Sequence, residues 1–303
     1  MYTTQLKVAT WNLLAPCYRR MASGRESEDE ELWRERTVKQ AEVLKSLDAD
    51  VYLLQEMWFQ PDYVSQLKRE VGERYEIVSM RRPNGKRDGV AIMFNRDKME
   101  RVEVIKKYEY ENDVGHRVLL AAHAYLAQQD GDKAMPSLFS SSPLCFVVTH
   151  FTYPHHDYDI NVVRVEQAKQ CAGIMHTLAE KYGGRVVMGG DFNGNSELDD
   201  PAMHIVEGVV HPSSVVSMAK LGTTHITHNS TLVSVDRLYR SSSSSAALEE
   251  SEEEEVKLKE EKVDVYPLKY GRKEEWPSFS RLVSDHRPVV VVYSLTHSPT
   301  KSQ

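Results

Sequence analysis

The stretch Arg185-Val186-Val187-Met188-Gly189-Gly190-Asp191-Phe192-Asn193-Gly194-Asn195 decides the fold of this chain. Its apolar run predicts a buried strand, and the two glycines let the backbone turn sharply and approach a ligand closely. Asp191 and Asn193 lie two residues apart, so in extended backbone their side chains point the same way. One carboxylate and one amide at a sheet edge suit a hard metal ion with a phosphate beside it. The alternative is an Asx-rich turn between a strand and a loop.

Length and composition predict one large α/β domain over residues 1–303. Of these residues 41% are hydrophobic, which is enough for a sizeable core. We find neither the long apolar run of a transmembrane helix nor the apolar core of a signal peptide. The three cysteines, Cys17, Cys145 and Cys171, are odd in number and far apart. This usage favours reduced thiols in a cytoplasmic or nuclear protein over disulfides or a zinc site.

The formal net charge of −7 is concentrated in one segment. Residues 249–262 contain eight Glu and three Lys, so the rest of the chain is only mildly acidic. Such a charge argues against a non-specific DNA clamp, but it permits a nucleic-acid substrate where the site carries its own divalent cation. The low-complexity segment from Ser241 to Lys262 predicts a disordered surface insertion, and a protein partner for its acidic part is the alternative.

Hydrophobic patterning predicts strands interspersed with a few long helices. We expect Ser27 to be an N-cap that forms a capping box with Glu30. Some neighbouring strands are joined by short turns and others by helices, which favours two mixed β-sheets packed face to face with helices outside. The helices are expected after Ser27 and at 61–73, 162–182 and 202–209. The strands are expected at 7–12, 50–55, 75–80, 89–94, 101–108, 117–125, 144–149, 186–190, 233–239 and 287–293.

Several of these strands border a polar residue that a buried strand does not need. Each such residue has an ordinary explanation, such as a capped turn, a surface charge or a satisfied core histidine. Six occurrences in one chain instead indicate a site, because functional groups of α/β folds gather at one end of the strands. The residues are Asn12, Glu56, His150, Asp191 with Asn193, Asp236, and Asp285 with His286.

In this order, the segments that carry these residues resemble the endonuclease/exonuclease/phosphatase superfamily. The segments are TWN, LLQE, VVTH, GGDFN, VDRLY and SDHRP, and the resemblance runs from Lys7 to Tyr293. The superfamily includes pancreatic-type deoxyribonucleases, abasic-site endonucleases, nocturnin-like deadenylases, neutral sphingomyelinases and inositol polyphosphate phosphatases. The resemblance implies a four-layered α/β sandwich and Mg²⁺-dependent hydrolysis of a phosphoester.

The motif match implies a metal half of the site. Glu56 is expected to be the main Mg²⁺ ligand, with Asn12 beside it, since Mg²⁺ keeps several waters and needs only one or two carboxylates. Asp285 is expected to join the metal shell directly or through water. Mn²⁺ fits the same oxygen-rich ligands.

The match also implies a catalytic half. Asp191 is expected to orient or deprotonate the attacking water, and Asn193 to hold that water or a phosphate oxygen. His150 is expected to donate to a non-bridging oxygen as negative charge grows. His286 contacts the phosphate or acts as the base, with Asp236 accepting from its imidazole. The residues leave open whether Asp191 or His286 takes the proton.

Weaker matches add positioning and contact residues. The segment Arg87–Ile92 resembles the family's glycine-led strand near the substrate, and Arg164 with Gln167 resembles a recurrent R-x-x-Q feature. His155 and His156 are candidates for phosphate contact, with exposed loop histidines as the alternative. The aromatic side chains that we consider for base stacking, with a place in the core as the alternative, are Tyr18, Trp58, Tyr153 and Phe192.

Branch features favour a deadenylase-like enzyme. The segments Trp11-Asn12-Leu13-Leu14-Ala15 and Arg36…Glu56 look most like the nocturnin and carbon-catabolite-repressor branch, which implies an RNA 3′-exonuclease acting on single-stranded RNA. Glu56-Met57-Trp58 resembles the sphingomyelinase branch, so a small or lipid phosphodiesterase is an alternative. A non-catalytic binding module on the same fold is the alternative from another class.

Overall fold

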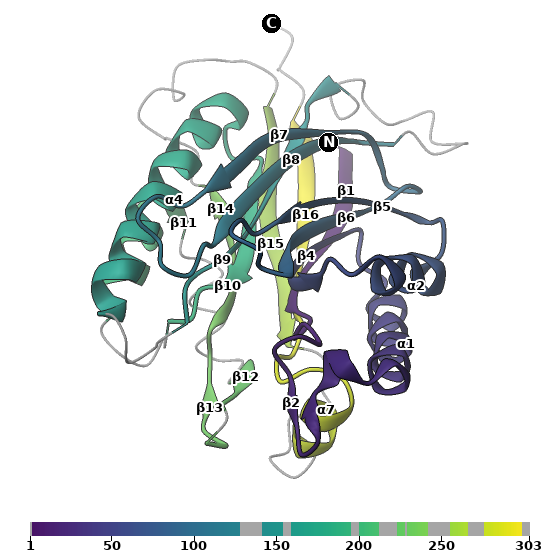
Figure 1. The fold of residues 1–303 in the computed structure, drawn as a ribbon. Helices are drawn as coiled ribbons and strands as arrows, with labels where there is room; N and C mark the ends of the chain where they lie inside the picture. The colour runs from purple at the N-terminus through teal and green to yellow at the C-terminus, as the bar shows by residue number, and fades with distance from the viewer. Residues whose placement is uncertain are drawn as a thin grey trace, which may run out of the picture.

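The computed structural model describes residues 2–127, 141–153, 159–194, 200–211, 223–227, 229–241, 255–265 and 276–298. Two six-stranded sheets dominate it (Figure 1). The first sheet has the order β15 (Glu255–Val265), β16 (Val289–Ser298), β1 (Tyr2–Asn12), β4 (Val51–Trp58), β6 (Asp88–Asn95) and β5 (Tyr75–Arg81). The second has the order β11 (Val210–His211), β14 (Asp236–Ser241), β10 (Val186–Asp191), β9 (Leu144–His150), β8 (Val118–Leu126) and β7 (Met99–Glu109).

Both sheets are mixed, with one parallel pair at the centre of each. In the first sheet β1 runs parallel to β4, and its other neighbour β16 is antiparallel. In the second sheet β10 runs parallel to β9, while β14 is antiparallel. The carboxyl ends of parallel strands lie at one edge of a sheet. The last residues of β1, β9 and β10 therefore lie where functional groups gather in α/β folds.

The sheets pack face to face, with helices on their outer faces. A core of alternating aliphatic side chains from both sheets fills the space between them, and Leu53 of β4 and Leu120 of β8 belong to it. The helices α1 (Glu30–Leu47), α2 (Pro61–Val71) and α7 (Trp276–Leu282) contribute to a second core against the first sheet. The helices α4 (Ile160–Tyr182) and α5 (Pro201–Glu207) pack on the second sheet (Figure 1). This confirms the expected sandwich of two mixed sheets flanked by helices.

Three short elements lie together at one end of the sandwich. They are the hairpin of β2 (Arg20–Met21) and β3 (Gly24–Arg25), the hairpin of β12 (His225–Ile226) and β13 (Leu232–Val233), and α7. Figure 1 shows them at its lower edge, below the lower ends of β1 and β4. Within the described ranges, no helix is long and apolar enough to cross a membrane.

The predicted N-cap is wrong by two residues. Residues Glu26–Glu28 form a 3₁₀ turn, and α1 starts after Asp29, whose Oδ1 accepts from the backbone N–H of Leu32 at 3.1 Å. Ser27 therefore lies inside the preceding turn. The pattern misled because Ser27 and Asp29 are both good caps, and the charged residues around them have no apolar period to fix the start of the helix.

The predicted disorder of the acidic insertion is wrong for its second half. Residues 255–262 belong to β15, which pairs antiparallel with β16 along the edge of the first sheet. Leu258 and Val265 of this strand are buried in the core between the sheets. The alternation of valine and leucine with charged residues is a strand pattern that the dense charge concealed. Residues 242–254 lie outside the described ranges.

Candidate active site

The metal half of the site forms at the end of β1. The parallel register places Asn12 beside Gln55, and Glu56 follows at a bulge where the register shifts between Gln55 and Met57. Glu56 has a φ of 53°, a left-handed conformation that is unusual for this residue. The bulge re-aims the carboxylate. Its Oε1 accepts from Asn12 Nδ2 at 3.4 Å and its Oε2 from the Ala15 N–H at 3.0 Å.

The catalytic half forms at the end of β10. Asp191 lies beside His150 in the parallel register with β9 and beside Asp236 in the antiparallel register with β14. A Cβ on Gly190 would lie 2.3 Å from the Thr149 carbonyl oxygen, so only glycine permits this approach of β10 to β9. The Gly-Gly pair thus lies inside the strand and not in a turn, and the left-handed residue is Asn193, with a φ of 50°.

Seven of the eight predicted site residues line one cavity of about 260 Å³. The eighth, Asp236, is fully buried behind His286. Arg82, Lys86 and Arg117 line the same cavity and add positive charge to it. We call this space the site cavity; its predicted members are Asn12, Glu56, His150, Asp191, Asn193, Asp285 and His286.

Asp191 lies at the centre of the polar network. Its Oδ2 accepts from Asn12 Nδ2 at 3.0 Å, which joins the two halves of the site, and its Oδ1 accepts from the Asn193 backbone N–H at 2.9 Å. The Nε2 atoms of His150 and His286 lie 3.4 Å and 3.7 Å from Asp191 Oδ2. One carboxylate therefore faces two imidazoles and one amide.

His286 and Asp236 form the predicted pair. Nδ1 of His286 donates to Asp236 Oδ2 at 2.8 Å, and both side chains are buried. Burial lowers the pKa of His286, but the carboxylates of Asp236, Asp191 and Asp285 outweigh it and raise the pKa to about 10. The imidazole is therefore a cation at neutral pH, with its Nε2–H directed toward Asp191.

His150 has a partner that the sequence did not indicate. Arg117 Nη1 donates to His150 Nδ1 at 2.8 Å. Arginine has no acceptor, so this shorter bond favours an unprotonated Nδ1 and places the hydrogen on Nε2, which lies 3.2 Å from Asn193 Nδ2 and 3.4 Å from Asp191 Oδ2. Burial, the Arg117 cation and more distant cations hold the pKa of His150 well below its ordinary value. His150 is thus a neutral donor directed into the site cavity.

His225 is a second residue that the sequence did not indicate. Its ring stacks on His286, with centroids 4.1 Å apart and planes 9° apart, and its Nε2 lies 3.6 Å from Asp285 Oδ2. Burial raises the pKa of Asp285, but the contact with His225 and the nearby cations outweigh it and lower the pKa. His225 sits in a two-residue strand, too short for periodicity to find.

The donor set of the metal half fits a hard divalent cation. Burial, followed by repulsion from Asp88, raises the pKa of Glu56 to about 7 against the opposing cations of Arg117 and His286, so a bound cation would favour its charged form. Oδ1 of Asp285 is buried and has no hydrogen-bond donor among the described residues. Carboxylate and amide oxygens with one unpaired acceptor suit Mg²⁺ or Mn²⁺. The close acid–histidine groups are Asp191, Asp236 and His286, and His225, Asp285 and His286.

The weaker candidates divide between the cavity, the core and the helix behind it. Tyr18 and Tyr153 line the site cavity, whereas Trp58 and Phe192 are buried in the helix-facing cores. In the segment Arg87–Ile92, Asp88 is the first residue of β6. Its Oδ1 accepts a hydrogen bond from the Tyr18 hydroxyl at 2.6 Å and forms an ion pair with Arg82 at 2.9 Å. His155 and His156 lie outside the described residues.

Arg164 and Gln167 of α4 anchor the loops that carry the catalytic residues. Arg164 donates to the Phe192 carbonyl at 3.2 Å and to Asp200 Oδ2 at 2.6 Å. Gln167 accepts from the Thr152 N–H at 3.0 Å and donates to the Thr152 hydroxyl at 2.9 Å. The R-x-x-Q feature thus fixes the backbone just after His150 and Asp191.

Solved structures share this fold over nearly the whole chain. TDP2 from Caenorhabditis elegans matches with a TM-score of 0.62 at 17% identity, covering 95% of this chain and 97% of that one. An endonuclease/exonuclease/phosphatase from Bacteroides vulgatus gives 0.63 at 18% identity, covering 97% and 100%. The human nocturnin catalytic domain gives 0.60 at 16% identity, covering 96% and 94%. At these identities the likeness shows the fold.

Sequence comparison gives the family. An uncharacterised calcium-binding protein from Arabidopsis thaliana is 24% identical over 204 residues, which cover 64% of this chain and 41% of that relative. The match thus spans less than half the length of that protein. The model of the Endonuclease/Exonuclease/phosphatase family matches residues 9–204, which is most of this chain and includes the strands that carry Asn12, Glu56, His150 and Asp191. The chain therefore belongs to the endonuclease/exonuclease/phosphatase family.

Proposed function

We propose that this protein is a divalent-metal-dependent phosphodiesterase of single-stranded nucleic acid, acting as a deadenylase-like RNA 3′-exonuclease. Members of its family are hydrolases of phosphodiester bonds. The observation that carries the proposal is the convergence of three carboxylates, two amides and three histidines on one cavity backed by Asp236.

In the proposed mechanism Asp191 handles the attacking water. His286 already carries its proton at neutral pH, since the neighbouring carboxylates raise its pKa to about 10. It therefore acts as a cationic donor, and Asp191 is the group that accepts or directs the proton of the water. The sequence leaves this choice open, and the proposal assigns the proton to Asp191.

Neutral donors surround the position of the phosphate. Nε2–H of His150 is directed into the cavity, where it meets a non-bridging oxygen as negative charge develops. Asn193 donates to the Phe151 carbonyl at 2.8 Å, which fixes its amide beside His150. Glu56, Asn12 and Asp285 would hold the divalent cation. When bound, such a cation polarises the phosphoryl oxygen and stabilises the leaving oxygen.

Three observations support a nucleic-acid substrate. The deadenylase-like segments around Trp11 and Glu56 favour RNA, and a fold neighbour, TDP2 from D. rerio, was solved with a single-strand DNA product. Tyr153 lines the site cavity and is 43% exposed, as a base-stacking side chain needs to be. Free, buried thiols at all three cysteines support a cytoplasmic or nuclear location.

A substrate panel tests the proposal. Purified full-length protein is incubated with Mg²⁺ or Mn²⁺ and with poly(A), mixed-sequence RNA, single-stranded DNA, sphingomyelin or bis(p-nitrophenyl) phosphate. We expect 3′-end shortening of RNA with release of mononucleotides, abolished by EDTA and by Asp191→Asn. Hydrolysis of sphingomyelin but not of RNA would overturn the substrate assignment. No turnover of any substrate, together with Mg²⁺ binding that Glu56→Gln does not change, would support a binding module instead.

A further inference from the structure

The site cavity opens beside a second and much larger hollow. This side cleft has a volume of about 1020 Å³, against about 260 Å³ for the site cavity. Its walls come from three segments, which contribute residues 14 and 18–22, residues 223, 226, 227, 230 and 232, and residues 280, 281 and 285. Leu14, Tyr18 and Asp285 line both spaces, so the two adjoin each other.

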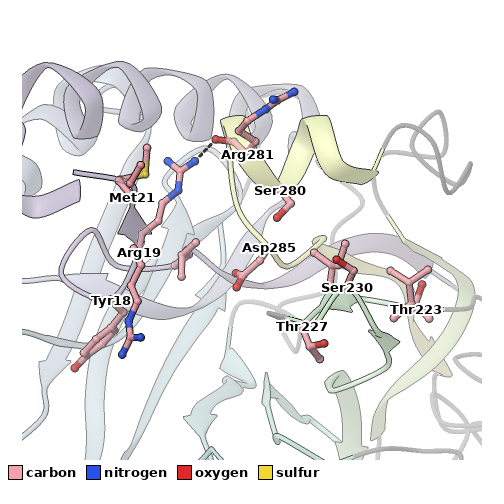
Figure 2. Close-up of a pocket in the computed structure, with 14 residues that line it drawn as sticks. Tyr18, Arg19, Met21, Thr223, Thr227, Ser230, Ser280, Arg281 and Asp285 are labelled. Atoms are coloured by element: carbon pink, nitrogen blue, oxygen red, sulfur yellow. Dashed lines mark hydrogen bonds between the residues drawn. The ribbon is translucent and has the colours of Figure 1, made fainter. Parts of the chain in front are cut away.

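The relative volumes indicate where the rest of a substrate lies. Pockets that enclose a drug-sized ligand measure ~300–1,000 Å³, so the site cavity holds a phosphodiester group and little more. A group attached to that phosphate needs a neighbouring space, and the side cleft begins at Asp285 beside the metal half. Figure 2 shows Asp285 and Ser280 between Tyr18 and Met21 on one side and Thr227 and Ser230 on the other.

The lining of the side cleft combines apolar surfaces with hydroxyls. Leu14, Met21 and Ile226 are each only partly buried, so they offer apolar surface to a ligand. Hydroxyls of Thr227 and Ser280 lie among them. An acyl chain would offer no acceptor to these hydroxyls, whereas a nucleotide offers a flat base to the apolar surfaces and sugar oxygens to the hydroxyls.

Among the arginines that line the side cleft, Arg20 has charge available for a ligand. Arg19 is committed, because it pairs with Glu26 at 2.5 Å and donates to the Arg281 carbonyl (Figure 2). The guanidinium of Arg281 points away from Asp285 in the same view. Arg20 is exposed and lines the cleft, and its guanidinium has no hydrogen bond or ion pair with another described residue. A free guanidinium is suited to phosphate.

We propose that the side cleft binds the nucleotide next to the scissile phosphodiester of a single-stranded nucleic acid, with its further phosphate at Arg20. The proposal rests on the proposed function, which supplies the scissile phosphate in the site cavity. It assigns the preference for a polynucleotide over a small diester to residues outside the catalytic set.

The kinetic test compares two substrates in each variant. We measure kcat/KM for a short single-stranded RNA and for bis(p-nitrophenyl) phosphate, and take their ratio. Arg20→Glu removes the phosphate contact, and Ser280→Trp fills the cleft. Each is expected to lower the ratio about tenfold. The matched controls, Arg69→Glu on α2 and Thr177→Trp on α4, are expected to leave it unchanged.

The binding test does not depend on turnover. Fluorescence anisotropy in EDTA measures the affinity of the full chain for labelled single-stranded RNA and DNA, and flotation measures binding to sphingomyelin vesicles. We expect Arg20→Glu to weaken oligonucleotide binding about tenfold and Arg69→Glu to leave it unchanged. Circular dichroism checks that Ser280→Trp folds, and the exposed Arg20 provides a variant that does not disturb the core.

The outcomes separate this proposal from the proposed function. An unchanged ratio, a parallel loss on both substrates, or an effect confined to vesicles would each overturn the nucleotide assignment while leaving a phosphodiesterase in place. If no diester is hydrolysed but Arg20→Glu still weakens oligonucleotide binding, the proposed function fails and the side cleft remains a nucleotide site.

Discussion

Arg117 donates from Nη1 to Nδ1 of His150 at 2.8 Å, and both side chains are buried at the wall of the site cavity. An arginine at this position selects the tautomer, because a guanidinium has only donors. It also disfavours a second proton on the ring through charge repulsion. His150 therefore presents one N–H to the cavity, and its charge does not change across neutral pH.

We predict that Arg117→Met raises the pKa of His150 and lowers kcat about 10–100-fold, the usual effect of losing a residue that orients a catalytic group. The ring is then free to adopt either tautomer. Two-bond ¹H–¹⁵N NMR reads the protonated nitrogen, and a pH titration reads the pKa. Arg69→Met, on the exposed face of α2, is the control. An unshifted titration of His150 would remove Arg117 from this role.

The pair of His286 and Asp236 gives a second prediction. Asp236→Asn is expected to lower the pKa of His286 from about 10 and to reduce kcat by about 10²–10⁴-fold, the range seen when a catalytic histidine loses its carboxylate. A raised folded-state pKa means that the pair stabilises the fold fully below the ordinary pKa of 6.5, and that this stability is lost as pH rises through about 10.

Urea unfolding in EDTA at several pH values tests that dependence, with the exposed Asp97→Asn as control. The wild type should lose stability between pH 6.5 and 10 more steeply than Asp236→Asn. Near-normal turnover in the folded variant would exclude the pair from the mechanism.

The parts of the site that lie on long strands could be predicted from the sequence. Asn12, His150 and Asp191 each end a run of apolar residues, and the parallel register brings such ends to one edge. Glu56 could also be predicted, because it comes after the apolar residues of β4, although nothing in the sequence marks the bulge that turns its carboxylate. The order of the six motifs along the chain, more than any single motif, favoured a functional site over an Asx-rich turn at Asp191.

Arg117 and His225, which contact the catalytic histidines, could not be predicted from the sequence. Arg117 precedes its strand, and it reaches His150 only because β8 lies beside β9 in the sheet. His225 meets His286 through an isolated bridge between segments 61 positions apart in the sequence. Both contacts are tertiary and leave no local period. The edge strand β15 was missed for a different reason. Edge strands carry charged residues that prevent aggregation, and here these residues concealed the strand pattern.

Glu56 gives a prediction about stability without metal. Burial, followed by Asp88, raises its pKa from 4.5 to about 7, so ionising it destabilises the metal-free fold. The penalty is absent below about pH 4.5 and complete above about pH 7. Glu56→Gln should therefore stabilise the metal-free protein by roughly 3 kcal/mol at pH 8, an effect that disappears near pH 4.5.

The same variant should lose the stabilisation that Mg²⁺ gives the wild type. Urea unfolding with EDTA and with Mg²⁺ measures both effects, and isothermal calorimetry measures metal affinity. Glu42→Gln on the exposed face of α1 is the control. Equal Mg²⁺ stabilisation of wild type and Glu56→Gln would show that the cation binds elsewhere.

Arg164 separates stability from catalysis. It pairs with Asp200 at 2.6 Å, and both side chains are largely buried. Arg164→Met leaves Asp200 as an unpaired buried charge, so we expect a loss of about 3–5 kcal/mol in the free energy of unfolding. Adding Asp200→Asn removes that charge and keeps the oxygen that caps α5, so the double variant should recover part of the loss.

Turnover should not recover with stability, because Arg164 also donates to the Phe192 carbonyl between Asp191 and Asn193. We expect kcat to fall about tenfold in both the single and the double variant, since a backbone shift of that loop misplaces both side chains. Urea unfolding and steady-state kinetics measure the two effects, with Lys169→Met on the exposed face of α4 as control. Recovery of kcat in the double variant would mean that Arg164 acts through Asp200 alone, and that the bond to Phe192 does not position the site.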